Sequence, residues 1–401
     1  MPWGIWSHLQ RKYLHLGYSG VHITPTRSWA SANSAGLMGR SYPSIQSLVG
    51  KQRGHRCIHI PPFLAPPVYF CGLLVALWVW KCVMLVVFQN KIIYMPGLPP
   101  NARSERIEDY ASSCGGIQWR EERTKTVDGK DLAMAVATIP LWRGGDEKSK
   151  AARAYVLYFQ GNASSTPPRL PDLSWVLRTV SDSKIPSLAC AELTFVCLSY
   201  RGYWTSRGCP SERGLRLDAE AGVQWIAQRH DRIFGTRSDS PIPILLVWGQ
   251  SIGSGIATNL AATGKIPEAM PIRGLLLETP FLSVRAMLET LYPQKWLPYK
   301  HLWPFLRNQL DSWANLGLIA EASKKKGGTA PGIFILEAER DELVPKVQSE
   351  QLYRRCVDLG LPVEKGIAPV AYHSEAIARG QGKKIAAQAI LQLAKRALES
   401  G

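Results

Sequence analysis

Residues 244–255 decide the fold of this chain: Ile244-Leu245-Leu246-Val247-Trp248-Gly249-Gln250-Ser251-Ile252-Gly253-Ser254-Gly255. The first four residues form an apolar strand pattern, and the alanine-rich segment that ends the stretch, residues 256–262, predicts a helix. A serine with glycines two residues before and two residues after it, between a buried strand and a helix, is typical of a nucleophile elbow. The same letters also fit a flexible glycine-serine loop, but the flanking strand and helix favour the elbow.

An elbow of this kind has a physical purpose. A serine hydroxyl is a poor nucleophile, so it must stand clear of the sheet, beside a base and near backbone N–H groups that bind the developing oxyanion. We expect Gly249 and Gly253 to remove Cβ atoms that would clash in so tight a turn. The N–H of Ile252 should point into the site from the helix N-terminus. Ser251 is the predicted nucleophile and Ile252 the first oxyanion donor.

Strand and helix patterns alternate on both sides of the elbow. The predicted strands are residues 117–126 and 132–139 (a hairpin), 154–159, 193–200, 242–248, 273–278, 332–337 and 363–372. The predicted helices are residues 169–184, 214–229, 256–262, 282–291, 347–359 and 375–398. Such alternation indicates an α/β fold with a mostly parallel central sheet covered by helices on both faces. With the elbow, it predicts the α/β-hydrolase fold.

Two later positions complete a Ser-His-Asp triad. The base needs a carboxylate that orients its ring, and in this architecture the chain order is Ser, then Asp or Glu, then His. Asp341 follows the strand at 333–336, and His373 follows the last strand. Both therefore fall in loops that belong at the same edge of the sheet as Ser251.

The competing residues fit less well. Five of the eight histidines precede residue 63, His230 ends a helix ahead of the serine, and His301 lies in a proline-rich insertion. Asp341 is favoured over Glu342 because it is nearer the strand end, while Glu339 and Asp358 are less suitable.

A second oxyanion donor should come from the loop after an earlier strand. The sequence Phe159-Gln160-Gly161-Asn162-Ala163 lies there, so the Gly161-Asn162 loop is the predicted site, with the N–H of Asn162 or Ala163 as donor. An ordinary Gly-Asn turn is the alternative. The sequon at Asn162 falls in this loop, and we therefore do not expect glycosylation there.

The first hundred residues differ from the rest of the 401-residue chain. The formal net charge is +17, yet no Asp or Glu precedes Glu105. No nucleic-acid-binding motif accompanies this charge, so nucleic acid is not an expected partner. Residues 1–62 form a basic leader. Its apolar residues recur every three or four positions, which fits either a mitochondrial presequence or a disordered tail: Trp3, Trp6, Leu9, Tyr13 and Leu16.

Residues 63–88 are the most apolar stretch and predict one transmembrane helix. A span needs about 20 apolar residues, and here Lys81 is the one ionised interruption. A buried core helix is the alternative, but a helix that is apolar on every side has no polar face for water. More basic residues precede the span than follow it closely, which places the N-terminus in the cytosol, unless mitochondrial import changes the orientation. The predicted location is an endomembrane such as the endoplasmic reticulum, or a mitochondrial membrane.

Residues 89–112 predict an extended juxtamembrane linker rather than a helix, and residues 113–401 the hydrolase domain. Residues 292–313 interrupt its rhythm with prolines, aromatic residues and basic residues. We interpret this insertion as a lid over the carboxyl ends of the strands, where open α/β sheets bind ligands. A well-packed surface insertion is the alternative. The eight cysteines form no C-x-x-C pair.

Residues 91–397 resemble the membrane-anchored α/β-hydrolases related to fungal Bem-type proteins and to animal α/β-hydrolase-domain serine hydrolases. The resemblance is carried by Tyr200-Arg201-Gly202-Tyr203, Ser206, Gly208, Pro210-Ser211-Glu212, Gly214-Leu215, Asp218-Ala219, 249–253, Leu277-Glu278-Thr279-Pro280-Phe281-Leu282-Ser283, Asp341-Glu342-Leu343-Val344-Pro345 and His373. It implies that Ser251, Asp341 and His373 are the triad. The chain departs from the family's His-Gly-Asn loop, because Gln160 replaces the histidine.

These features predict a single-pass membrane serine hydrolase that cleaves ester or thioester bonds through an acyl-enzyme. The expected substrate is a lipid or an acylated protein at a bilayer, and no metal or organic cofactor is expected. Two alternatives remain open: a catalytically silent membrane adaptor with the same fold, and a serine peptidase with the same triad.

Overall fold

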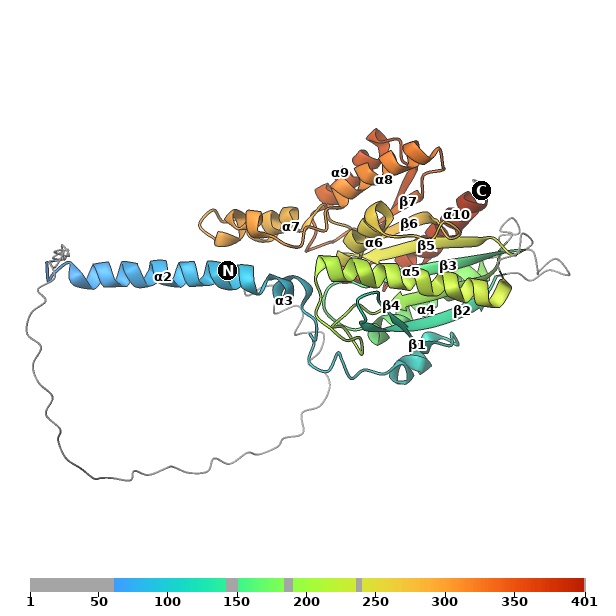
Figure 1. Ribbon diagram of the computed structural model, residues 1–401, viewed down its shortest axis with the longest axis horizontal. Coiled ribbons are helices and arrows are strands. Elements are labelled where there is room, and N and C mark those ends of the chain that lie inside the picture. The colour runs from blue at the N-terminus through green and yellow to red at the C-terminus, as the bar shows by residue number, and fades with distance from the viewer. Residues whose placement is uncertain (1–60, 142–150, 184–189, 236–239, 400–401) are drawn as a thin grey trace, which may run out of the picture. The chain divides into compact units, whose positions relative to one another are not determined.

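A computed structural model describes residues 61–141, 151–183, 190–235 and 240–399 (Figure 1). The basic leader predicted at residues 1–62 lies almost entirely outside the described residues, and so does its predicted amphipathic helix. The predicted strands and most predicted helices fall within the described ranges.

One eight-stranded sheet forms the centre of the protein, in the order β1-β2-β4-β3-β5-β6-β7-β8. The strands are β1 (Arg120–Lys125), β2 (Asp131–Pro140), β3 (Ala152–Phe159), β4 (Cys190–Leu198), β5 (Pro243–Gln250), β6 (Ile272–Glu278), β7 (Gly332–Ala338) and β8 (Val363–Ala368). Strand β2 pairs antiparallel with β1 and β4, and the other pairs are parallel. The mostly parallel sheet predicted from the sequence is confirmed.

Apolar residues of the central strands are buried on both faces of the sheet. In β3, Ala154, Val156 and Tyr158 belong to the core on one face, while the residues between them belong to the core on the other. Side chains of a strand alternate between faces, so a continuous apolar run is stable only where helices cover both sides.

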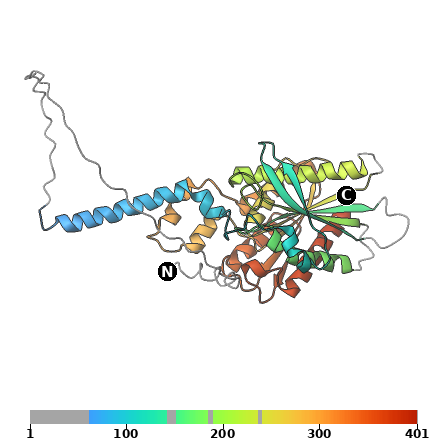
Figure 2. The same cartoon turned by 90° about the horizontal axis from the view of Figure 1, so that it is seen from below.

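Two layers of helices provide that cover (Figures 1 and 2). On one face lie η1 (Ile107–Cys114), α4 (Leu170–Asp182) and α10 (Gly380–Glu399). On the other lie α5 (Glu212–Phe234), α6 (Ile252–Thr263), α8 (Ser312–Lys326) and α9 (Lys346–Asp358). Figure 2 shows the strands between α5 and α10.

The structure corrects several details of the prediction. The segment after the apolar span is not wholly extended, because α3 (Gln89–Tyr94) is a short helix. Helix α8 was not predicted. The closing helix begins at Gly380, since residues 373–375 form a separate 3-10 turn, η6 (His373–Glu375).

Between α7 (Val284–Leu291) and α8 lies a segment of short turns, η4 (Pro298–His301) and η5 (Trp303–Phe305). We call residues 292–311 the cap segment. It occupies most of the predicted lid, and its action as a lid remains a prediction.

Helix α2 (Ala65–Val87) is long and apolar enough to cross a membrane, and most of its side chains are exposed. The chain that follows packs onto the sheet domain. Tyr94 is fully buried, its hydroxyl donates to Asn308 Oδ1 at 3.0 Å, and its carbonyl accepts from the Tyr203 hydroxyl. Ala102 and Ile107 are also buried.

The carboxyl ends of the parallel strands meet at one edge of the sheet. Gln160 follows β3, Ser251 follows β5, Glu278 ends β6, and Asp341 and His373 follow β7 and β8. The topology therefore gathers side chains from five strands, far apart in the sequence, at the edge where such sheets bind ligands.

Candidate active site

Ser251 lies on a sharp turn between β5 and α6. Its backbone has φ +50° and ψ −115°, a conformation that L residues rarely adopt. The Ser251 N–H donates to the Glu278 carbonyl at 2.8 Å, which holds the turn against the end of β6. A Cβ at Gly249 would collide with the Gly253 backbone, and a Cβ at Gly253 would collide with the Phe159 carbonyl. Glycine is therefore required at both positions.

Ser251, His373 and Asp341 meet in one chain of hydrogen bonds, which we call the active-site cluster. His373 Nε2 lies 2.8 Å from Ser251 Oγ, and His373 Nδ1 lies 2.8 Å from Asp341 Oδ2. The imidazole and the carboxylate are 8% and 9% exposed. In this arrangement the imidazole can accept the serine proton while the carboxylate orients the ring.

Backbone hydrogen bonds fix the two partners of the serine. Asp341 Oδ1 accepts from the N–H groups of Leu343 at 3.0 Å and Val344 at 2.8 Å. The neighbouring carboxylate, Glu342, accepts the His373 N–H at 2.9 Å. Glu342 was a rival to Asp341 in the sequence, and the structure gives it a different contact, with the histidine backbone.

The other described histidines have partners elsewhere. His230 is buried, with Nδ1 3.0 Å from the Tyr155 hydroxyl and Nε2 3.1 Å from the Pro241 carbonyl. His301 Nε2 lies 3.0 Å from the Lys295 carbonyl. Within the described ranges, no group of three or more His, Cys, Asp or Glu side chains is arranged to hold a metal ion.

The two predicted oxyanion elements flank the serine. Ile252 is the first residue of α6, so its N–H has no intrahelical acceptor. In the loop after β3, the N–H of Gly161 donates to Gln250 Oε1 at 3.2 Å and the N–H of Ala163 donates to Asn162 Oδ1 at 2.8 Å. Among the described hydrogen bonds, the Asn162 N–H is unused.

Gln160, which replaces the family's histidine, braces this loop from within. Its side chain is buried, Oε1 accepts from the Thr166 hydroxyl at 3.0 Å, and Nε2 donates to the Ala163 carbonyl at 3.4 Å. Its own carbonyl accepts from the Tyr200 hydroxyl at 2.8 Å. An amide can donate and accept at once, so Gln160 holds both ends of the loop.

A buried ion pair that sequence reasoning missed lies beside the active-site cluster. Arg169 donates to Glu278 Oε1 at 2.6 Å and to the Ser374 carbonyl, next to His373, at 3.0 Å. Glu278 Oε2 accepts from the Trp248 indole at 3.0 Å. Burial raises the pKa of Glu278, and the Arg169 charge opposes that rise. One sequence signal was available: Glu278 ends the apolar run Leu275-Leu276-Leu277 at the functional edge.

A second ionic group is centred on Arg201 of the Tyr-Arg-Gly-Tyr motif after β4, where buried Arg201 and Asp218 meet the exposed Asp128. Arg201 donates its N–H and Nε to Asp218 at 2.9 and 2.8 Å, and its terminal nitrogens to Asp128 at 2.8 and 3.0 Å. Burial raises the pKa of Asp218 to about 6 although Arg201 opposes it. Hydrogen bonds from Arg201 lower the pKa of Asp128 to about 2. We call these three residues the Arg201 cluster.

Known proteins similar to this chain include three curated relatives. Protein bem46 of Schizosaccharomyces pombe is 29% identical over 274 residues, which cover 68% of this chain and 76% of that protein. The alpha/beta hydrolase domain-containing protein WAV2 of Arabidopsis thaliana is 28% identical over 278 residues, covering 68% and 77%. Lysophosphatidylserine lipase ABHD12 of Danio rerio is 30% identical over 226 residues, covering 54% of this chain and 53% of that enzyme. No family model matches the chain.

Solved structures share the fold at low sequence identity. An alpha-beta hydrolase from Vibrio vulnificus aligns with a TM-score of 0.50 at 19% identity, covering 74% of this chain and 90% of that one. A fungal esterase from Rhizomucor miehei aligns with a TM-score of 0.51 at 14% identity, covering 75% and 91%. The predicted α/β-hydrolase fold and the resemblance to the Bem-type and α/β-hydrolase-domain group are confirmed. The lipase relative supports hydrolase activity.

Proposed function

We propose that this chain, whose curated relatives are α/β-hydrolase-domain proteins of the bem46, ABHD12 and WAV2 group, is a membrane-anchored serine hydrolase that cleaves an ester or thioester bond. The observation that carries the proposal is the continuous hydrogen-bonded contact from Ser251 through His373 to Asp341, with both links at 2.8 Å. A catalytically silent adaptor would not need a base hydrogen-bonded to the Ser251 hydroxyl. It would also not need the free N–H of Ile252 beside that serine.

In the first half of the reaction, His373 Nε2 takes the proton of Ser251 as Oγ attacks the carbonyl carbon of the substrate. The negative charge that develops on the carbonyl oxygen is held by the N–H of Ile252 and the N–H of Asn162. Gly161 contributes the backbone conformation of the loop and not a donor, since its own N–H is donated to Gln250. Collapse of the tetrahedral intermediate breaks the ester or thioester bond, and the leaving alcohol or thiol takes the proton from His373.

In the second half, water replaces the leaving group. His373 accepts a proton from the water as its oxygen attacks the acyl carbon, and the same two N–H groups hold the second oxyanion. The acyl–serine bond breaks, the carboxylic acid leaves, and the proton returns to Ser251 Oγ. Asp341 stays ionised throughout and stabilises the imidazolium that forms in each half. No residue outside the active-site cluster changes its covalent state.

A lipid ester is the favoured substrate class, and an acylated protein at the membrane is the second. The Danio rerio relative is a lysophosphatidylserine lipase by name, and α2 is long and apolar enough to cross a bilayer. We accordingly assign residues 63–88 to the membrane span, 89–112 to the juxtamembrane linker and 113–401 to the hydrolase domain, with a lid at about 292–313.

A fluorophosphonate probe tests the proposal, because it reacts covalently with a serine that a neighbouring base activates. The full chain should be labelled, and Ser251→Ala should lose the label. The exposed Ser113 supplies a matched control, and Ser113→Ala should be labelled like the wild type. Labelling that persists in Ser251→Ala would exclude Ser251 as the nucleophile. A wild-type chain that reacts with no probe and no ester would exclude the hydrolase function and favour the adaptor.

A further inference from the structure

The cap segment lies along the C-terminal part of α2 (Figures 1 and 2). The Trp78 indole N–H donates to the Trp296 carbonyl at 3.5 Å, and Lys81 Nζ lies 5.4 Å from the centre of the Tyr299 ring. Just beyond α2, at the first residue of α3, Gln89 Nε2 donates to the Phe305 carbonyl at 3.2 Å. The cap segment therefore accompanies α2 from Trp78 to its end.

If α2 crosses the bilayer, the cap segment cannot lie wholly in water. The 23 residues of α2 rise about 34 Å in total, and the part ahead of Trp78 rises only about 20 Å. The hydrocarbon core of a bilayer is about 30 Å thick, and any tilt of the helix shortens its reach. Even if Phe63 and Leu64 continued the span, the free part of α2 would remain too short. Part of α2 that lies beside the cap segment must therefore enter the bilayer.

The cap segment carries side chains suited to that depth. Trp296, Phe305 and Trp303 are 74%, 60% and 43% exposed, which is costly in water for rings of this size. Trp is enriched where a protein crosses the boundary between hydrocarbon and headgroups. Exposed basic side chains that suit lipid phosphates are nearby, at Lys91 and Lys295.

Hydrogen bonds hold the cap segment to the end of α2. Arg307 donates its N–H to Gln89 Oε1 at 2.7 Å and a guanidinium nitrogen to the carbonyls of Val86 and Val87 at 3.0 and 3.3 Å. These carbonyls belong to the last turn of α2, whose acceptors lack intrahelical partners. The depth of the cap segment is thus tied to the depth of the helix.

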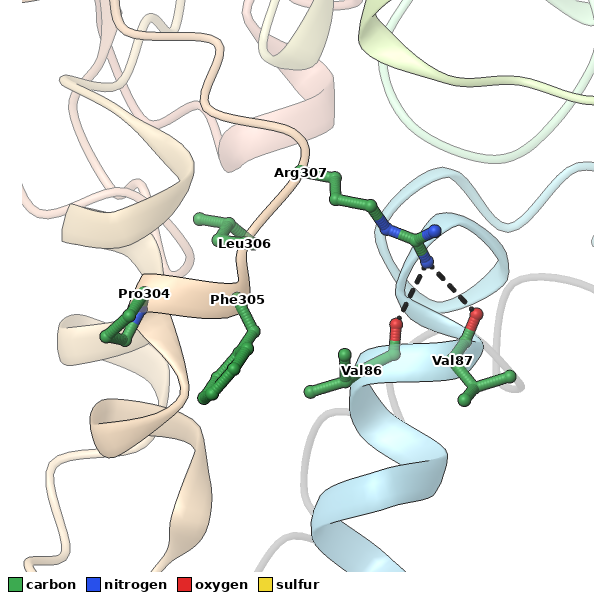
Figure 3. Close-up of a pocket in the computed structure, with 6 residues that line it drawn as sticks. All are labelled: Val86, Val87, Pro304, Phe305, Leu306 and Arg307. Atoms are coloured by element: carbon green, nitrogen blue, oxygen red, sulfur yellow. Dashed lines mark hydrogen bonds between the residues drawn. The ribbon is translucent and has the colours of Figure 1, made fainter.

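An open cleft separates the two elements just beyond these bonds (Figure 3). Its walls are Val86 and Val87 on α2 and Pro304, Phe305, Leu306 and Arg307 on the cap segment. The lining is mainly apolar, and Figure 3 shows the Arg307 guanidinium at one end of it. An acyl chain has the polarity for such a cleft.

We infer that the cap segment is an interfacial element that enters one leaflet beside α2 and binds bilayer phospholipid, with acyl chains against Trp296 and Phe305 and in the cleft at Val86. The inference rests on the proposed crossing of the membrane by α2. It adds to the proposed function a direct contact between the lipid and the segment next to α7 and α8, so that a lipid substrate can approach from the bilayer.

Photo-cross-linking in vesicles tests this contact. The full chain, reconstituted in phosphatidylcholine vesicles that contain a clickable phosphatidylcholine, carries a benzophenone amino acid in place of Phe305. Leu73, in the middle of α2, is the membrane control, and the exposed Val357 on α9 is the water control. We expect lipid cross-linking at position 305 to approach that at position 73 and to exceed that at position 357 several-fold.

Two results would overturn the inference. Cross-linking at position 73 but only background at position 305 would leave the cap segment in water, and background at both positions would remove α2 from the bilayer. Fluorophosphonate labelling of the same samples measures the reactivity of Ser251 independently of the lipid contact. Retained labelling with failed cross-linking rejects the lipid contact alone, and lost labelling with strong cross-linking rejects the hydrolase function alone.

Discussion

The active-site cluster and the Arg201 cluster make opposite uses of buried polar groups at one edge of one sheet. In the Arg201 cluster the guanidinium and backbone N–H of Arg201 are all committed to two carboxylates. In the active-site cluster the hydroxyl of Ser251 has one described hydrogen bond, with Nε2 of His373. A polar side chain whose hydrogen bonds are all made within the protein stabilises the fold. A side chain that can still bind another group can take part in a reaction. The two clusters should therefore respond differently to mutation, one in stability and the other in rate.

Ser251→Ala should produce the largest effect and should affect only the rate. Loss of the nucleophile in a triad lowers kcat by about 10⁶-fold, because the remaining groups act only in concert with it. Hydrolysis of a soluble short-chain ester measures the rate, and thermal unfolding measures stability, which we expect to stay at the wild-type level. A large drop in the unfolding temperature would show that the active-site cluster also holds the fold.

Asp341→Asn should follow, with a loss of about 10⁴-fold in kcat, as expected when the orienting carboxylate becomes an amide and the imidazole adopts the wrong tautomer. The new side chain can still accept from Leu343 and Val344, so the loop should keep its shape. Glu342→Gln is the matched control, since the described hydrogen bond of Glu342 is with the backbone N–H of His373 and not with its ring. Equal losses in the two variants would contradict the assignment of Asp341.

Arg201→Met should reverse the pattern. It leaves Asp218 buried without its partner, and breaking a buried ion pair in this way costs about 3–5 kcal/mol in the free energy of unfolding. Denaturant unfolding gives the number. Arg201→Met combined with Asp218→Leu should recover part of the loss, because no charge remains buried. Wild-type stability in the single variant would mean that the Arg201 cluster does not support the fold.

Glu278→Gln should affect both stability and rate. Arg169 would lose a charge-assisted bond of about 1.5 kcal/mol, and we expect kcat to fall about tenfold as the loop at His373 loosens. As a positioning residue, Glu278 should affect kcat more than KM. Glu192→Gln removes the same charge near the start of β4, at the opposite edge, and should leave kcat unchanged. A change in KM alone would argue for a substrate contact instead.

Another prediction concerns the dependence of stability on pH. Burial raises the folded pKa of Asp218 to about 6, above the value of about 3.9 for an unfolded chain. The folded state then binds the proton more tightly, so this group stabilises the fold below pH 4 and loses that contribution as the pH rises through 6. The stability of the wild type relative to Asp218→Asn should therefore decrease between pH 4 and pH 7. An increase would show that the Arg201 charge outweighs burial.

Much of this architecture could be read from local patterns. The apolar run at 244–247, the paired glycines around Ser251 and the hairpin turn at Asp128 each specify their structure within a few residues. Asp341 and His373 followed from chain order and from their places after late strands. For that reason the elements of the sheet and the residues that meet at Ser251 were accessible without coordinates.

The features that could not be predicted depend on contacts between segments far apart in the sequence. Helix α8 follows a proline-rich segment, and the sequence pattern of its residues did not lead to a predicted helix. Arg169 and Glu278 lie 109 positions apart. The apolar run before Glu278 marks that residue, but nothing in the sequence around Arg169 indicates that the two side chains pair. The bond from Gly161 to Gln250, which occupies the Gly161 N–H, depends on the spacing of β3 and β5 rather than on either loop.

The burial of Tyr94 has a practical consequence for where the folded body starts. The Ser164 N–H donates to the Leu98 carbonyl at 2.5 Å, and the Trp204 indole donates to the Glu105 carbonyl at 2.7 Å. The chain just beyond α2 is thus part of the support for the loop at Asn162. A water-soluble fragment cut at residue 113 would expose the wall behind that loop, whereas one that starts ahead of Tyr94 keeps it closed.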